Sequence, residues 1–239
     1  MSDPYPPRTP SLGALQNAIK NLAVDMIKYQ FSDHKVQVVG LGSGNTVGAI
    51  VKEIARLPYS NRTEFVATSL QIKKEAENNG LVIVDESRIP SIDIVIDGAD
   101  QVDSKFYMIK GGGGALLKEK VLISAAKKVI VAADSNKFVG KFNCPIPIEV
   151  HPFARSIVWI KLQEAGGIPN LRTIEKGYPF ITESGNIIFD TSFNLLSDVP
   201  TKEINLKGIP GVLEVGLFTR RADIYYKAKS DGSFEMITF

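Results

Sequence analysis

The sequence predicts an α/β protein, in which a mostly parallel sheet with helices on both faces is joined to a smaller α+β domain. Three observations favour this class. Short runs rich in valine and isoleucine alternate with stretches whose apolar residues repeat at helical spacing. These runs are almost continuously apolar, as in strands that are covered on both faces. After Pro145 the alternation gives way to shorter, mixed segments.

The elements follow from these patterns in chain order. Residues 1–10 contain four prolines and predict a flexible arm. Strands are expected at 36–41, 65–67, 81–84, 92–96 and 129–133, and helices at 11–27, at 47–55, between the second and third strands, and from the glycines at 111–114 to about 126. We expect 1–144 and 217–239 to form the α/β domain.

The smaller domain is expected to span 145–216. Residues 152–166 have a helical pattern, 171–174 an extended one, and Ser184-Gly-Asn186 indicates a hairpin. The tail at 222–238 is strand-like around the turn signal Asp231-Gly232.

Composition excludes several classes of protein. Of the 239 residues 44% are apolar and 23% are charged, which is ordinary for a globular chain. A net charge of +2 offers no basic excess for nucleic acid, and no apolar run reaches the roughly 18 residues of a membrane span. Cys144, His34 and His151 make a poor start for a zinc site. The single cysteine cannot form an intrachain disulfide, so we expect a cytoplasmic protein, with no nucleic-acid or membrane partner.

The segment Gly40–Thr46 follows a predicted strand and opens a helix. Glycines permit close backbone approach, the helix start offers free N–H groups to an anion, and Ser43 and Thr46 add hydroxyls. The segment is no Walker loop, and Asn45 stands where a dinucleotide fingerprint needs its third glycine. It predicts a monophosphate site, with a tight, hydroxyl-capped turn as the structural alternative.

Two further strand ends carry polar groups that suit the same ligand. Thr68-Ser69 could contact phosphate or sugar, or simply cap a helix. Lys137 could bind phosphate, or be a solvated loop lysine. In parallel sheets ligands bind beyond the carboxyl ends of the strands, where these residues are expected.

Asp97 and Asp100 follow the strongly apolar predicted strand 92–96 and are separated by two small residues. Paired carboxylates can divide proton-transfer roles on sugar hydroxyls or bind a metal; an Asx turn is the structural alternative.

The stretch Lys110–Lys120 holds four consecutive glycines, Gly111–Gly114. Such a run is costly in entropy but leaves backbone amides free to face a ligand. Lys110 could offset a developing negative charge, and Glu119 in the following helix could act as a base. The alternative is a flexible loop followed by a solvated helix.

In this order the segments resemble the ribose-5-phosphate isomerase A family, from about residue 12 to 226. The motifs that carry the resemblance are Gly42-Ser-Gly-Asn-Thr46, Thr68-Ser69, Asp97-Gly-Ala-Asp100, Lys110-Gly-Gly-Gly-Gly-Ala-Leu-Leu-Lys-Glu-Lys120, Ala133-Asp-Ser-Asn-Lys137, Pro147-Ile-Glu-Val150 and Ile209-Pro-Gly-Val212. The resemblance implies an aldose–ketose isomerase of the pentose phosphate pathway that interconverts ribose 5-phosphate and ribulose 5-phosphate through an enediolate. It also implies that the reaction needs neither a metal nor an organic cofactor, and that the protein is a homodimer or homotetramer.

The resemblance assigns roles to individual residues. Glu119 would be the base between C2 and C1, Asp97 would serve the sugar oxygens and ring opening, Asp100 would hold and polarise hydroxyls, and Lys110 would stabilise the enediolate. Thr46 and Lys137 would hold the phosphate. The full expected binding set is Gly42, Ser43, Gly44, Asn45, Thr46, Thr68, Ser69, Gly111, Gly112, Gly113 and Lys137.

Four positions depart from the family pattern. The family usually has Ser at Asn45, Glu at Gln101, a phosphate-binding Lys at Gln16 and Asn at Val215. Two other function classes compete with the isomerase. A sugar-phosphate sensor without catalysis would need a DNA-binding helix pair and a basic face. A CoA acyltransferase with a glutamate nucleophile would need a nucleotide-sized site.

Overall fold

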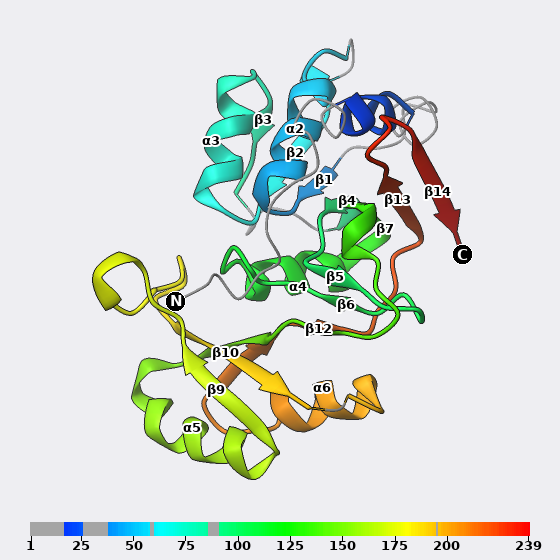
Figure 1. Ribbon diagram of the computed structural model, residues 1–239. Coiled ribbons are helices and arrows are strands. Elements are labelled where there is room, and N and C mark those ends of the chain that lie inside the picture. Colours follow the sequence, from blue (N-terminus) through cyan, green and yellow to red (C-terminus); the bar gives the residue numbers. More distant parts are fainter. Residues whose placement is uncertain (1–16, 26–37, 58–59, 86–90, 195) are drawn as a thin grey trace. The chain divides into compact units, whose positions relative to one another are not determined.

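The computed structural model describes residues 17–25, 38–57, 60–85, 91–194 and 196–239, so the proline arm and Gln16 lie outside the described residues. The chain forms two compact units (Figure 1). The larger unit holds the described residues up to Ala99, with Lys118–Phe138 and Ala222–Phe239. The smaller unit holds Asp100–Leu117 and Val139–Arg221.

The larger unit is built on a seven-stranded sheet of order β14-β13-β7-β4-β1-β2-β3. All neighbouring strands are parallel except β13 and β14, which form an antiparallel hairpin. The strands are β1 (Val38–Leu41), β2 (Glu64–Ala67), β3 (Val82–Ile83), β4 (Ile92–Asp97), β7 (Ala126–Asp134), β13 (Ile224–Ala228) and β14 (Phe234–Thr238).

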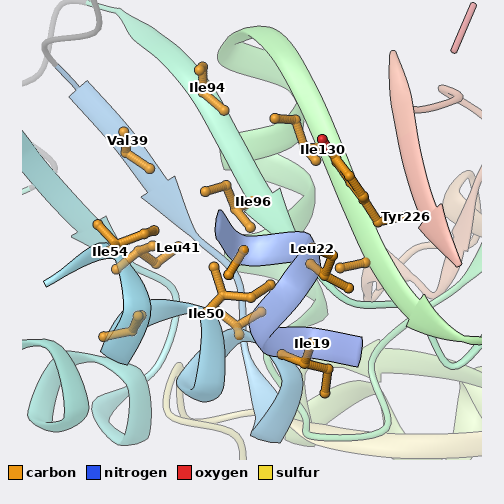
Figure 2. Packing of buried hydrophobic residues seen from close by; sticks show 14 of the residues in the cluster. Ile19, Leu22, Val39, Leu41, Ile50, Ile54, Ile94, Ile96, Ile130 and Tyr226 are labelled. Atoms are coloured by element: carbon orange, nitrogen blue, oxygen red, sulfur yellow. The ribbon is translucent and has the colours of Figure 1, made fainter. Parts of the chain in front are cut away.

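Helices cover both faces of this sheet, which confirms the predicted fold class. Residues 17–25, α2 (Gly44–Ile54) and α3 (Leu70–Asn78) pack on one face in a single apolar cluster. Figure 2 shows the side chains of that cluster, with those of the helices over those of the strands. On the other face α4 (Leu116–Ala125) packs so closely that a Cβ on Gly40 would lie 3.3 Å from Leu122 Cδ1.

The smaller unit contains two antiparallel sheets, of orders β11-β8-β10-β9 and β12-β6-β5. Its helices α5 and α6 bury apolar side chains against the four-stranded sheet in a second core. The elements are β5 (Gln101–Val102), β6 (Met108–Ile109), β8 (Ile146–Val150), α5 (Arg155–Glu164), β9 (Gly167–Leu171), β10 (Ile187–Phe193), α6 (Val199–Lys207), β11 (Val212–Val215) and β12 (Leu217–Phe218).

The described residues include the short 3₁₀ turns η1 (Ser60–Arg62), η3 (Ser135–Lys137), η4 (Pro152–Ala154) and η5 (Glu175–Gly177). The helix predicted at 152–166 is therefore η4 followed by α5. His151 caps η4, where its Nδ1 accepts a hydrogen bond of 3.3 Å from Phe153 N.

The extended pattern expected at 171–174 is found in part, since Leu171 ends β9 and Thr173 forms an antiparallel bridge with Pro179. The compact smaller unit also takes in Asp100–Leu117. The reason is that β6 pairs with β12, which joins Met108 and Ile109 to the segment at Leu217 and Phe218. None of the described helices has the length and hydropathy that crossing a membrane requires.

Candidate active site

The carboxyl ends of the parallel strands meet at one edge of the seven-stranded sheet. Leu41 is paired with Ala67 on one side and Ile96 on the other. The chain leaves these strands in hydrogen-bonded contact, because Gly42 N donates to Ile96 O (2.8 Å) and Thr68 N donates to Leu41 O (3.0 Å). This edge is where a parallel sheet binds ligands.

Asp97 is fully buried at this edge. Its Oδ1 accepts hydrogen bonds from Gly98 N (2.7 Å) and Ser43 N (3.3 Å). The carboxylate lies so close to Gly42 that a Cβ there would be 1.9 Å from Asp97 Oδ1. Gly42 is therefore required because Asp97 occupies the space of its missing side chain.

Glu119 lies in the first turn of α4 and is only 2% exposed. Its Oε1 accepts a hydrogen bond from Ser43 Oγ. Ser43 thus contacts both carboxylates, with its backbone N–H on Asp97 and its hydroxyl on Glu119. The structure brings these three predicted residues together within the larger unit.

The first turn of α2 holds no acidic residue and no capping side chain. Ser43 is the N-cap residue of this helix but makes no side-chain capping bond. Gly44 has φ +90°, a conformation that L side chains rarely adopt, while Asn45 is exposed and Thr46 partly exposed. The unsatisfied N–H groups and the dipole of this helix suit a phosphate.

The neighbouring hydroxyls differ in their local roles. Ser69 caps α3, because its side chain accepts from Ile72 N at 3.3 Å. Thr68 is 1% exposed, and among the described residues its Oγ1 has no hydrogen-bond partner. Thr68 therefore keeps a polar atom for a ligand, whereas Ser69 first serves the helix.

Lys137 ends η3, just beyond β7, and is partly exposed. Asp134, the last residue of β7, was not predicted as a site residue. Burial raises the pKa of the Asp134 carboxyl, and the charge of Lys137 opposes that shift. The signal was in the sequence, since Asp134 directly follows the apolar run Val129–Ala133.

Asp100 and the glycine run belong to the smaller unit. Asp100 Oδ2 accepts a hydrogen bond of 2.7 Å from Gly112 N, and a Cβ on Gly112 would lie 2.7 Å from Asp100 Oδ1. In both pairs the carboxylate occupies the space that a side chain on the glycine would need: Asp100 at Gly112 and Asp97 at Gly42. Gly111 and Gly114 have positive φ values of +106° and +83°, and Gly113 is exposed.

Lys110 precedes the glycines and is 3% exposed. Its Nζ lies 5.6 Å from the centroid of the Phe218 ring, and its backbone N donates to Gly216 O (3.0 Å). The aromatic face attracts the buried ammonium group and so holds its positive charge at a fixed position. Phe218 was not identified from the sequence.

Arg172 and Asp190 were also missed. Arg172 Nη1 donates to Gly111 O (2.8 Å) and Gly112 O (3.2 Å), while its Nε donates to Asp190 Oδ2 (2.8 Å). The available signal was an acidic residue, Asp190, directly after the apolar residues Ile187, Ile188 and Phe189.

The departures from the family pattern have local explanations where the structure describes them. Gln101 is buried and exchanges amide hydrogen bonds with Asn143. Val215 is fully buried in the core of the smaller unit, and Asn45 is exposed. In the described part of the chain no three His, Cys, Asp or Glu residues are grouped to hold a metal ion.

Comparison with known proteins places this site in a class. The family model of ribose 5-phosphate isomerase A (phosphoriboisomerase A) matches residues 64–232. The ribose-5-phosphate isomerase A of Methanosarcina acetivorans is 37% identical over 204 residues, 84% of this chain and 87% of its own.

Two solved structures share the whole fold. Ribose 5-phosphate isomerase A from Methanocaldococcus jannaschii has a TM-score of 0.84 at 29% identity, over 95% of this chain and 99% of its own. A D-ribose-5-phosphate isomerase in complex with phospho-erythronic acid has a TM-score of 0.85 at 31% identity, over 94% and 98%.

These likenesses define the class of protein: an aldose–ketose isomerase. They give no support to a sensor domain without catalysis. The chain belongs to the ribose 5-phosphate isomerase A family.

Proposed function

We propose that this protein interconverts ribose 5-phosphate and ribulose 5-phosphate, with Glu119 as the base that carries the proton between C2 and C1. The observation that carries this assignment is the buried Glu119 carboxylate on the rigid helix α4, oriented by the Ser43 hydroxyl. A base on a rigid element with a fixed partner is suited to a carbon-bound proton.

The proposed reaction needs three kinds of group. Glu119 removes the C2 proton of the open-chain aldose, and the C1 carbonyl oxygen becomes an enediolate oxygen. The proton of the C2 hydroxyl then passes to that oxygen, and return of the carbon-bound proton to C1 gives the ketose. Lys110 stabilises the enediolate, while Asp97 and Asp100 serve the sugar oxygens and ring opening. General-base catalysis is typically worth about 10²–10⁴-fold, and one oxyanion donor about 2.7–4 kcal/mol.

The phosphate is assigned to the larger unit. Residues 43–46 at the start of α2 supply backbone N–H groups, Thr46 and Thr68 supply hydroxyls, and Lys137 supplies a cation. Binding energy from this remote group orients the reacting carbons. The complex of a relative with phospho-erythronic acid, a phosphorylated sugar acid, supports a ligand of this kind.

The remaining assignments follow from the family and are part of the same proposal. The reaction belongs to the pentose phosphate pathway and takes place in the cytoplasm, with no cofactor, no metal, and neither nucleic acid nor membrane as partner. Gly42, Gly44, Asn45, Ser69 and the glycines at 111–113 complete the binding set. The domain boundaries at 144/145 and 216/217 stay a prediction.

We also propose a homodimer or homotetramer. Phe153 in η4 and Ile157 and Ile160 in α5 are 95%, 60% and 50% exposed, and such exposed apolar side chains close together along the chain are what a second copy could cover. Light scattering should give a mass above 26.1 kDa that falls in Ile157→Asp. A monomeric wild-type protein would contradict this.

The test of the base is Glu119→Gln, which keeps the shape and removes the proton acceptor. We expect kcat for ribose 5-phosphate to fall at least about 10²-fold with KM little changed, because general-base catalysis is lost. Exchange of the C2 proton with solvent deuterium should stop as well.

The matched control is Glu164→Gln, the same chemical change at an exposed residue that pairs with Lys161. It should leave turnover unchanged. Near-normal turnover and exchange in Glu119→Gln would show that another residue is the base, with Asp97 the next candidate. Inactivity caused by unfolding, seen in circular dichroism, would make Glu119 a structural residue.

A further inference from the structure

The Arg172–Asp190 ion pair contacts the glycine run Gly111–Gly114 of the smaller unit through hydrogen bonds from Arg172 to backbone carbonyls. The guanidinium and the carboxylate are joined by two parallel bonds, and their side chains are only 11% and 7% exposed. The guanidinium also lies 5.7 Å from the centroid of the Phe180 ring. Phe180 in turn leaves no room for a side chain at Gly114, whose Cβ would be 2.6 Å from that ring.

A buried ion pair is weak evidence for stability, because desolvating the two charges offsets most of their attraction. The contacts of Arg172 suggest another role. While Nε and Nη2 bind Asp190, Nη1 donates to the carbonyls of Gly111 (2.8 Å) and Gly112 (3.2 Å). Only the rigid fork of a guanidinium can hold a carboxylate and two carbonyls in this way.

Holding these carbonyls sets the direction of the following amides. Every peptide bond of the described residues is trans, so each C=O and the next N–H point in opposite directions. The carbonyl of Gly111 faces Arg172, and accordingly Gly112 N–H points to Asp100 Oδ2 at 2.7 Å. By the same geometry the Gly112 carbonyl on Arg172 turns the N–H of the exposed Gly113 away from the guanidinium.

We propose that Arg172, anchored by Asp190, is a positioning residue that aims the Gly112 and Gly113 amides, and through them Asp100, at the reacting oxygens of the sugar. The inference rests on the proposed isomerase function. Consecutive glycines have the largest conformational freedom of any chain segment, so they need an external restraint. Misplacing a catalytic group by about 1 Å can cost about 10²-fold in rate.

The test is Arg172→Lys, which keeps a cation for Asp190 but cannot hold the two carbonyls as well. We expect kcat for ribose 5-phosphate to fall about 10- to 100-fold. The affinity for phospho-erythronic acid, measured by calorimetry, should weaken at least about tenfold. Inhibition by inorganic phosphate should stay unchanged, because phosphate is assigned to the larger unit. Arg56→Lys, in an exposed ion pair with Glu53, is the matched control and should behave as wild type.

A purely structural role would lower the melting temperature and leave kcat per folded molecule unchanged, and that result would overturn the proposal. Asp190→Asn is the second variant; it removes the anchor with little change of shape and should lower kcat in the same direction. Unfolding of both variants would also overturn the proposal, because the pair would then be a requirement of the fold. If wild type and Arg56→Lys both fail to convert ribose 5-phosphate, the proposed function is wrong. If Arg172→Lys folds and keeps a normal kcat, only the positioning role of Arg172 is refuted.

Discussion

Gly42→Ala should disable the enzyme by displacing Asp97. A Cβ at position 42 would lie 1.9 Å from Asp97 Oδ1 and 2.0 Å from its Cγ. To regain an ordinary van der Waals separation the carboxylate would have to retreat by roughly 1.5 Å. That movement is enough to break its hydrogen bonds from Gly98 N and Ser43 N, which measure 2.7 and 3.3 Å.

The size of the effect follows from this displacement. Misplacing a catalytic group by about 1 Å can cost about 10²-fold, so we expect a fall in kcat of that order. Overpacking at a buried position typically costs about 1–3 kcal/mol, so the free energy of unfolding should fall by that amount without loss of the fold. Initial rates with ribose 5-phosphate and urea unfolding measure the two quantities.

Gly48→Ala, in the helix α2 that begins just after Gly42, is the matched control. The nearest atoms to a Cβ there are Glu75 Cγ and Ile72 Cδ1, both at 3.9 Å, which is ordinary contact. Alanine inside a helix is about 0.5–1 kcal/mol better than glycine, so this variant should be slightly more stable and fully active. If Gly42→Ala keeps kcat within about threefold of wild type, Asp97 does not need its observed place, and the reasoning fails. Loss of activity in Gly48→Ala would show a general sensitivity of α2 instead.

Three more predictions follow from the site. Lys137→Ala should raise KM and weaken competitive inhibition by inorganic phosphate, because a phosphate-binding cation is lost; an unchanged KM and inhibition constant would refute this. Burial raises the pKa of Asp134 above its ordinary 3.8, so the folded state favours the protonated carboxyl and this residue should make stability fall as pH rises through that window. In urea unfolding between about pH 3.5 and 6, the free energy of unfolding of Asp134→Asn should rise relative to that of wild type as pH rises. A difference between the two proteins that does not depend on pH would contradict the direction given for this pKa shift. Exhaustive chelation should leave turnover unchanged, and activity that is lost on chelation and restored by added Mg²⁺, Mn²⁺ or Zn²⁺ would show a metal requirement.

Local sequence pattern was sufficient to predict the parallel sheet and to place part of the candidate site at its edge. The apolar run predicted at 92–96 is β4, and the turn signal Asp231-Gly232 joins β13 and β14. Ser43 and Asp97 were predicted as site residues because they follow strand ends, and these ends meet at one edge when strands are parallel. Hydrophobic periodicity and turn chemistry are properties of neighbouring residues, so they can be read along the chain.

Contacts between distant segments were decided only by the tertiary structure. The strands β5, β6 and β12 have two residues each, too few for a period, and exist because Met108 and Ile109 meet Phe218 and Leu217 across the chain. Arg172 reaches Gly111 over a separation of 61 residues, and nothing near either residue in the sequence predicts that contact. In the sequence, a charged or polar residue reads the same whether its side chain is solvated, caps a helix as Ser69 does, or holds a loop in place. Its hydrogen-bond partner depends on which segments the packed cores bring within hydrogen-bonding distance, and only the complete tertiary structure determines those segments.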